Sequence, residues 1–363
     1  MILLPDLTRD EMVAWAGEQG LPPYRGRQLY AAVFRRLITS LDEATDLPLD
    51  LRARLAHEVA VSPLVVQQTQ RHDEARTEKA LFRMPDGALI EGVLMDYPAE
   101  RGGGRHTVCL SSQVGCALAC RFCATGLQGF TRHLSAGEIV AQVLHFERAL
   151  RARGAHVTNV VYMGMGEPLH NYEHTIASVR LLTDPHGFNL GQRHITISTA
   201  GVVPAIRRLA HEGLQVGLAI SIHAATDEAR SALMPINRRY PIDELLDACH
   251  EYVATTHRRV TFEYTLMRGV NDGVGDARAL AERLRGLLCH VNIIPWNPVE
   301  GMPFQPSPRA AVDAFRDALT ATGIPVTVRD TKGSAIQAAC GQLKTAAVRE
   351  RRPELRALPV ASA

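Results

Sequence analysis

Hydrophobic positions near the start of the chain recur every three or four residues, which is the spacing of one helix face. The clearest run consists of Leu29, Val33, Phe34 and Leu37. A similar pattern covers residues 46–58. Together these runs predict a small helical unit over residues 1–75.

The pattern then changes from helical spacing to alternation. The stretch EKALFRMPDGALIEGVLM, residues 78–95, contains two alternating segments on either side of Pro85, Asp86 and Gly87. Proline and glycine favour a tight turn at that point, so the stretch predicts a β-hairpin. We assign residues 76–104, which include a Gly-rich linker, to this hairpin extension.

From residue 105 onward, apolar runs of strand length alternate with amphipathic stretches of helix length. The expected strands cover residues 107–113, 157–164, 194–201, 216–223, 259–267 and 290–297, and the clearest helices cover 135–154 and 241–256. Repeated βα units are joined by right-handed crossovers and form a parallel sheet. We expect an α/β fold with a partial (βα)6 barrel over residues 105–330 and a C-terminal segment over 331–363.

Composition agrees with a large enzyme that folds around its own core. The chain has 363 residues, of which 46% are hydrophobic and 21% are charged. Its start lacks the pattern of a signal peptide, and no run approaches the roughly 18 apolar residues of a membrane span. Seven cysteines, an odd number with three clustered, do not suggest a disulfide framework. We expect a cytoplasmic protein with no membrane association.

Cys116, Cys120 and Cys123 form a C-x3-C-x2-C triplet. Iron–sulfur cubanes are normally held by four cysteines, and the next cysteine along the chain is Cys249. Three thiolates would leave one iron for a small molecule, and S-adenosylmethionine is the natural candidate. A structural zinc site is the alternative, because paired cysteines also bind zinc. Zinc would need a fourth ligand at comparable spacing, and His133 lies beyond a Gly-rich turn.

This spacing, with the aromatic Phe122 before the last cysteine, resembles the signature of the radical S-adenosylmethionine superfamily. The resemblance implies a 4Fe-4S cluster, S-adenosylmethionine as cofactor and the partial barrel of that superfamily. Active sites of barrels lie at the carboxyl ends of the strands. In GMGEP, Gly164 and Gly166 would let the backbone approach the ligand. Glu167 would accept a hydrogen bond from the ammonium group of S-adenosylmethionine.

Other strand ends carry mostly small polar groups that would complete the S-adenosylmethionine pocket. These residues are Ser198, Ser221, Ile222, His223 and Asn297. Ordinary turn and capping roles are the alternative for each polar residue taken singly.

Two further cysteines narrow the assignment to a family. Alternation over residues 107–113 puts Cys109 on the polar face that should line the barrel, and Cys340 lies in AACGQLK. With LSSQVGCALACRFCATG, GMGEP, SIHA and IPWNP, these segments resemble the adenine carbon-2 RNA methyltransferases that act on 23S ribosomal RNA and transfer RNA. The resemblance covers most of the chain, including the helical unit over residues 1–75, and it implies that this unit is an RNA-binding accessory domain. A buried, inert thiol is the alternative for both, and it is our interpretation of Cys249 and Cys289.

The resemblance implies methylation of adenosine 2503 in 23S ribosomal RNA and of adenosine 37 in transfer RNA, with two molecules of S-adenosylmethionine per turnover. Cys340 would accept a methyl group from the first molecule by thiolate substitution. Radical chemistry with the second would join the methyl carbon to the ring, and Glu91 would take the ring proton. Cys109 would release the product by attacking the Cys340 sulfur, which leaves a disulfide. A solvent-facing position on a strand is the alternative for Glu91.

The resemblance also implies partners, namely both RNAs and an electron donor such as flavodoxin or ferredoxin, for a monomeric enzyme. Aromatic residues make up only 5% of the chain, so we expect RNA binding to be mainly electrostatic. Candidates for phosphate contacts are Arg25, Arg27, Arg238, Arg239, Arg258, Arg259 and a basic tail over residues 344–356. Two other functions stay open: methylation of adenine carbon 8, and a non-catalytic iron–sulfur protein that assists RNA assembly.

Overall fold

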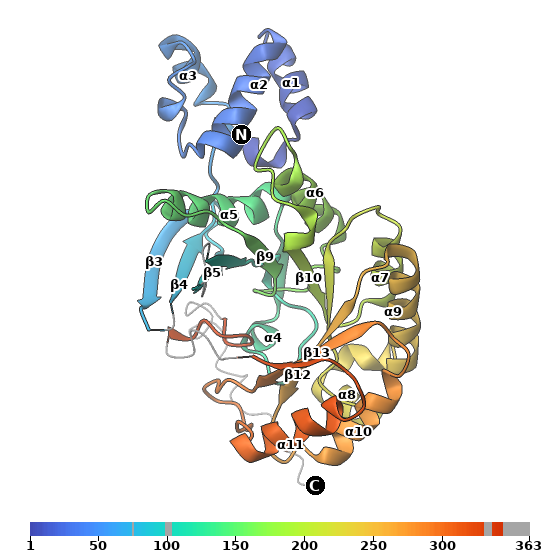
Figure 1. The fold of residues 1–363 in the computed structure, drawn as a ribbon. Coiled ribbons are helices and arrows are strands. Elements are labelled where there is room, and N and C mark those ends of the chain that lie inside the picture. Colours follow the sequence, from blue (N-terminus) through green and yellow to red (C-terminus); the bar gives the residue numbers. More distant parts are fainter. Residues whose placement is uncertain (75, 99–103, 330–335, 344–363) are drawn as a thin grey trace.

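The computed structural model describes residues 1–74, 76–98, 104–329 and 336–343 (Figure 1). The predicted basic tail, residues 344–356, lies outside the described residues. The main feature of the fold is one ten-stranded sheet with the order β14-β13-β12-β11-β10-β9-β6-β5-β4-β3.

Seven neighbouring strands of this sheet run parallel. They are β6 Arg105–Cys109, β9 Asn159–Tyr162, β10 Ile195–Thr199, β11 Gly217–Ser221, β12 Val260–Leu266, β13 Cys289–Pro295 and β14 Val326–Val328. The first six confirm the six predicted strands, and their order in the sheet is their order in the chain. A parallel sheet that always adds its next strand on the same side winds in one direction, so the protein has the expected partial barrel.

Helices connect the parallel strands and cover the outside of the barrel (Figure 1). They are α5 Ala136–Arg151, α6 Tyr172–Thr183, α7 Val203–Ala210, α8 Asp227–Leu233, α9 Ile242–Thr256, α10 Val274–Arg283 and α11 Arg309–Thr320. Both predicted helices, now α5 and α9, are confirmed. In α5 the fully buried side chains Ile139, Val143, Phe146 and Leu150 recur at helical spacing and face the sheet.

Three antiparallel strands extend the barrel sheet from β6. They are β3 Val65–His72, β4 Thr77–Arg83 and β5 Leu89–Tyr97. The predicted hairpin is therefore confirmed as β4 and β5, and Gly87 takes a φ of +80° in its turn. The expectation that helices extend to about residue 75 is wrong for residues 65–72. Strand β3 is a largely exposed edge strand, so its sequence shows no apolar alternation.

The helical unit before β3 lies at the top of Figure 1. It contains α1 Arg9–Glu18, α2 Pro23–Ala31 with a π-helical turn Ala32–Arg36, α3 Leu49–Leu55, and short parallel strands β1 Ile2–Leu3 and β2 Val59–Ala60. The four apolar positions predicted to share a helix face, residues 29, 33, 34 and 37, are all buried. The domain boundaries at residues 75, 104 and 330 stay predictions.

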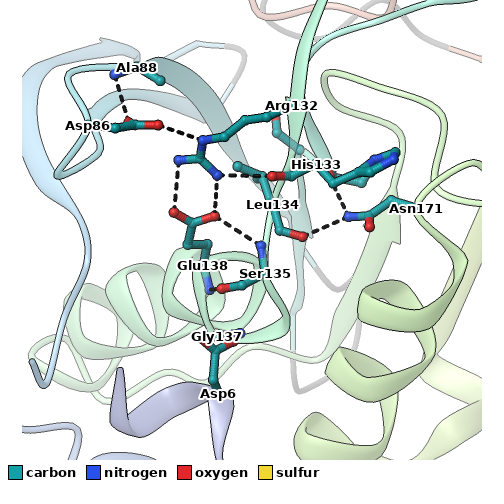
Figure 2. Close-up of polar contacts among 12 residues, drawn as sticks. Asp6, Asp86, Ala88, Arg132, His133, Leu134, Ser135, Gly137, Glu138 and Asn171 are labelled. Carbon is teal, nitrogen blue, oxygen red and sulfur yellow. Dashed lines mark hydrogen bonds and ion pairs between the residues drawn. The ribbon is translucent and has the colours of Figure 1, made fainter. Parts of the chain in front are cut away.

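Arg132 joins three parts of the chain (Figure 2). It lies in β8 Phe130–His133, and its Nε donates to Asp86 of the β4–β5 turn over 2.6 Å. Its two terminal nitrogens donate to both carboxylate oxygens of Glu138, in the first turn of α5, over 2.7 and 2.9 Å. At the same helix end, the Gly137 N–H donates to Asp6 of the helical unit over 2.5 Å. Helical unit, hairpin and barrel thus meet at the start of α5.

None of the helices in the described part of the chain combines the length and the apolar composition that crossing a membrane requires.

Candidate active site

The cysteine triplet lies in the loop between β7 Gln113–Gly115 and α4 Ala124–Gln128. Strand β7 pairs with β8 just after α4, so the loop is closed at its base. Gly115 is required there: its φ is +74°, and a Cβ atom would lie 1.9 Å from the carbonyl oxygen of Gly129. The Cys116 N–H donates to the same carbonyl over 3.0 Å. The fold thus brings the start and the end of the cysteine loop together.

The three thiols line one cavity of about 160 Å³ at the barrel mouth. Burial raises the pKa of Cys116 to about 12 and also raises the pKa of Cys120 and Cys123. Bringing thiols into this cavity therefore favours their protonated form, unless a metal centre replaces the protons. No group of three or more Cys, His, Asp and Glu side chains within the described residues is arranged to hold a single metal ion. Three soft thiolates around one cavity fit an iron–sulfur cluster.

The GMGEP segment follows β9 and lines the same cavity through Gly164, Gly166 and Glu167. Both glycines allow another segment of the backbone to pack closely against GMGEP, and the atoms nearest to them belong to this neighbouring segment. A Cβ at position 164 would lie 2.4 Å from the Leu110 carbonyl oxygen, and one at position 166 would lie 2.6 Å from Cβ of Gln113. The glycines therefore pack this segment against the chain that leads from β6 into the cysteine loop.

Glu167 is only 3% exposed, and its carboxylate is held by backbone donors. Oε1 accepts from the Leu169 N–H over 3.0 Å, and Oε2 accepts from the Ala200 N–H over 2.7 Å. Burial raises the pKa of Glu167 to about 7, against the opposing effect of these hydrogen bonds. Each carboxylate oxygen can accept a second bond, so the side chain could still receive a ligand ammonium group.

Ser198, Ser221 and His223 line the same cavity as the three thiols. His223 Nδ1 accepts from the Thr265 N–H over 2.9 Å, and burial lowers the pKa of this imidazole to about 3. His223 is therefore a neutral ring, and it packs edge-on against Phe122 with 4.8 Å between ring centroids. The imidazole thus connects the wall of the cavity to the cysteine loop.

Ile222 and Asn297 take other positions. Ile222 is 1% exposed and packs in the hydrophobic core, and its carbonyl accepts from Nε of Arg230 over 3.1 Å. Asn297 lines a second cavity beside the first, where its Nδ2 donates to the Cys340 carbonyl over 3.2 Å. Asn297 therefore contacts the predicted methyl-carrying loop directly.

Cys109 and Cys340 line this second cavity together, although they lie far apart in the sequence. Both are free thiols, and Cys340 lines the first cavity as well. Cys109, at the end of β6, is 7% exposed, and burial raises its pKa to about 12. The loop that carries Cys340 packs against α4, because the Ala124 N–H donates to the Gly341 carbonyl over 2.8 Å. The two predicted cysteines are thus brought together beside the cysteine triplet.

Comparison with known proteins gives the same assignment. Residues 110–281 match the Radical SAM superfamily, and residues 2–61 match the ribosomal RNA large subunit methyltransferase N-terminal domain. The chain is 50% identical to a probable dual-specificity RNA methyltransferase RlmN of Chloroflexus aurantiacus, over 94% of this chain and 92% of that protein. It is 47% identical to dual-specificity RNA methyltransferase RlmN 1 of Myxococcus xanthus, over 97% of both chains. This chain belongs to the RlmN family.

A solved relative of this RlmN family member has the same fold. The crystal structure of a radical SAM methyltransferase from Sphaerobacter thermophilus superimposes with a TM-score of 0.92 at 50% identity, covering 95% of this chain and 99% of that one. The predicted family, the partial barrel and the enzyme class, a radical SAM RNA methyltransferase, are therefore confirmed.

Glu91 of this RlmN family member is buried in β5, with an exposed fraction of 4%. Its alternative interpretation, a solvent-facing glutamate on a strand, is wrong. The carboxylate lies 3.0 Å from the ammonium group of Lys79, and the backbone carbonyl accepts from the Ser111 hydroxyl over 2.6 Å. Glu91 does not belong to the described residues that line the two cavities.

Sequence reasoning missed two cations near the cysteine pair. Arg329 lines both cavities and lies 3.4 Å from Glu263. Lys79 pairs with Glu91. The pairing of the hairpin strands could have pointed to Lys79. Residue 83 lies opposite residue 89, so residue 79 lies opposite residue 93, two positions from Glu91 on the same face of the sheet. Arg329 follows the short strand β14, a position where charged residues are common, and its sequence context contains no comparable signal.

The arginines proposed for phosphate contacts differ in their surroundings. Arg27, Arg238, Arg239 and Arg259 are exposed. Arg25 is partly buried and donates to Gln28 over 2.8 Å and to the Asp46 carbonyl over 3.1 Å. Its role in RNA binding stays a prediction, as do those of the exposed arginines.

Proposed function

We propose that this enzyme methylates carbon 2 of adenosine 2503 in 23S ribosomal RNA and of adenosine 37 in transfer RNA, and that Cys340 carries the methyl group. One observation carries the proposal: Cys340 lines both the cavity of the cysteine triplet and the cavity that contains Cys109. An RNA-binding assembly factor would need neither of these two thiols. The curated relatives are named as dual-specificity RNA methyltransferases, which supports two RNA substrates.

The chemistry of the target explains the need for these groups. Carbon 2 of adenine is an electron-poor aromatic carbon, so a direct polar attack on a methyl sulfonium is not open to it. A 4Fe-4S cluster on Cys116, Cys120 and Cys123, with bound S-adenosylmethionine, would supply one-electron chemistry. We assign Glu167, Ser198, Ser221 and His223 to the S-adenosylmethionine pocket because they line the cavity of the triplet.

The two partner thiols have separate tasks in this proposal. Cys340 accepts a methyl group from one S-adenosylmethionine, and a second molecule is consumed when the methyl carbon is activated and joined to the ring. Cys109 then loses its proton and attacks the Cys340 sulfur, so that a sulfur–sulfur bond forms and the bond from this sulfur to the methylene carbon breaks. The released carbon takes up a proton and becomes the methyl group of the RNA, and a disulfide remains. Burial raises the pKa of Cys109 to about 12, so this thiol stays protonated while Cys340 is methylated and does not compete for the methyl group.

Glu91 is the proposed acceptor of the proton that leaves the adenine ring. It is buried 3.0 Å from the Lys79 ammonium, in the strand next to β6, which ends at Cys109. A buried carboxylate in this position can act as a general base once RNA binds within its reach. The target base must leave its stack to enter the barrel, as chemistry on a ring atom requires.

We also propose a monomer that works in the cytoplasm with an electron donor such as flavodoxin or ferredoxin. The proposed ribosomal and transfer RNA substrates are cytoplasmic, and a reducing compartment keeps the five functional thiols reduced.

The test is anaerobic reconstitution with iron and sulfide, reaction with S-adenosylmethionine, a reductant and RNA, and nucleoside mass spectrometry. We expect 2-methyladenosine from both 23S ribosomal RNA fragments and transfer RNA, matched to a synthetic standard. Cys340→Ala is the control and should give no methylated product with its cluster intact. Formation of 8-methyladenosine would overturn the proposed position of methylation, and methylation by Cys340→Ala would overturn the role of that thiol.

A further inference from the structure

Lys79 connects two segments that lie far apart in the sequence. It is on β4 and only 8% exposed. Its ammonium nitrogen lies 3.0 Å from Oε1 of Glu91 on β5, and it donates to the backbone carbonyl of Gln337, 258 residues further along, over 3.3 Å. Gln337 begins the turn that leads to Cys340. One buried cation therefore contacts both the proposed base and the start of the cysteine-carrying loop.

Gln337 needs support at this point because of its backbone conformation. Its φ is +52°, in the left-handed region that non-glycine residues adopt rarely. This conformation is strained for an L-residue other than glycine. Further along the loop, Asn297 holds the Cys340 carbonyl at 3.2 Å and Ala124 holds the Gly341 carbonyl at 2.8 Å. Lys79 thus holds the strained start of the loop, and Asn297 and Ala124 hold its other end.

The other side of the Lys79 contact is firmly attached to the barrel. The Glu91 carbonyl accepts from the Ser111 hydroxyl over 2.6 Å, and the oxygen of that hydroxyl accepts from the Met165 N–H over 2.9 Å. Met165 directly precedes Gly166 in the GMGEP segment, which lines the first cavity. Lys79 is therefore anchored to the same part of the barrel that forms the candidate cofactor pocket.

We propose that Lys79 is a positioning residue that holds the loop over residues 337–340 so that Cys340 reaches both cavities. A buried ammonium group is costly to leave without hydrogen-bond acceptors. The Lys79 ammonium group therefore favours the loop position in which the Gln337 carbonyl accepts its hydrogen bond. The inference rests on the proposed function, in which Cys340 carries the methyl group. It adds a physical link between the methyl-carrying loop and the proposed base Glu91.

The test measures how fast iodoacetamide alkylates Cys340 in the cluster-free, RNA-free full chain, with the modified peptides identified by mass spectrometry. Lys79→Met keeps the length of the side chain and removes its charge. We expect it to raise the Cys340 alkylation rate several-fold, because the loop loses its tie and the thiol leaves its place beside the two cavities more often. Arg71→Met is the matched control, since Arg71 forms an exposed ion pair with Glu78 in the same antiparallel extension. The control should react at the wild-type rate.

A second substitution separates loop positioning from a general loss of stability. Glycine adopts a φ of +52° without strain, so Gln337→Gly should lower the alkylation rate of the Lys79→Met variant back towards the wild-type value. Unchanged alkylation in a folded Lys79→Met variant, or no rescue by Gln337→Gly, would overturn the proposal. If Lys79→Met does not fold, the shorter neutral side chain of Lys79→Gln carries the same test with the same expected direction.

The proposed function is checked separately in the same preparations. Mass spectrometry of reconstituted wild-type protein after reaction with S-adenosylmethionine shows whether Cys340 is methylated. An unmethylated wild-type Cys340 would refute the proposed function, while the alkylation rates of the cluster-free variants would still decide whether Lys79 holds the loop.

Discussion

At the scale of single residues, the two partner thiols differ in their access to solvent. Cys109 is buried at the end of β6, whereas Cys340 is exposed on its loop. In the proposed reaction the sulfur that carries the methyl group must be accessible to two cofactor molecules and to an RNA base, and the exposed Cys340 meets this requirement. A thiol that must act last benefits from burial, because burial keeps it protonated. Their positions thus match the order of the proposed steps.

This order predicts the behaviour of Cys109→Ala. Methylation of Cys340 and its addition to the ring come before the resolving step, so the variant should accumulate RNA covalently joined to the protein through Cys340. Denaturing gel electrophoresis, followed by ribonuclease digestion of the shifted band, measures the adduct. Cys109→Ala/Cys340→Ala is the control and should show no such band. Wild-type turnover by Cys109→Ala without any adduct would be incompatible with the resolving role.

At the scale of elements, the start of α5 is a joint between the helical unit, the hairpin turn and the cysteine loop. Ser135 caps the helix, and Glu138 reaches back to the Ser135 N–H over 2.9 Å while its carboxylate also accepts both Arg132 bonds. Such paired contacts between guanidinium and carboxylate are the strong form of an ion pair. Because β8 closes the cysteine loop, the same joint also fixes the base of the loop.

Arg132→Met should therefore destabilise the protein by about 1–3 kcal/mol, the usual range for breaking a network of partly buried polar contacts. Urea unfolding of the cluster-free protein measures the change. Arg309→Met is the control, because Arg309 is 78% exposed and pairs with Asp313 of its own helix, where an ion pair contributes about 0.5 kcal/mol or less. An equal free energy of unfolding for the two variants would mean that the Arg132 contacts at the start of α5 stabilise the protein no more than an exposed ion pair does.

A second prediction concerns the packing of α5 against β4. His145 packs against Phe82 and Phe146 at 5.1 Å between ring centroids, and burial lowers its pKa from 6.5 to about 4. Between these values the unfolded chain binds a proton that the folded protein does not, so stability must fall as the pH drops from 6.5 towards 4. His145→Gln should lose less stability over that interval than the wild type. Urea midpoints at pH 7 and pH 4.5 measure this, and equal losses in the two proteins would contradict it.

At the scale of the whole molecule, one continuous sheet connects the parts that the proposed reaction needs. The antiparallel strands carry Glu91 and Lys79, the parallel strands end at the two cavities, and the C-terminal loop crosses back to α4. Figure 1 shows the helical unit at one end of this assembly, above α5 and α6. Tyr30 of that unit donates to Asp184, in the loop after α6, over 2.6 Å. The match to an RNA methyltransferase N-terminal domain therefore falls on a unit that is attached to the barrel by polar contacts.

The barrel and the cysteine triplet could be predicted from local sequence patterns, whereas contacts between distant segments could not be predicted. Six strands could be predicted because strand-length apolar runs alternate with helix-length amphipathic stretches, which is the pattern of repeated βα units. Strand β3 escaped this reasoning because an exposed edge strand has no apolar face. Ile222 was assigned to the cofactor pocket together with Ser221 and His223, whereas its side chain is buried in the hydrophobic core. Lys79 could not be connected with Gln337 from the sequence, since nothing local predicts a contact across 258 residues.

The most direct test of the central claim follows the methyl group through Cys340. Protein methylated with S-adenosylmethionine that carries a fully deuterated methyl group is isolated, and RNA is then methylated in a single turnover with unlabelled S-adenosylmethionine. Because one hydrogen must leave the methyl carbon before it joins the ring, we expect the first product to carry two of the three deuterium atoms. Cys340→Ala should give no methylated product. A first product with no deuterium in the wild type would contradict the account, because its methyl group would then not have come from Cys340.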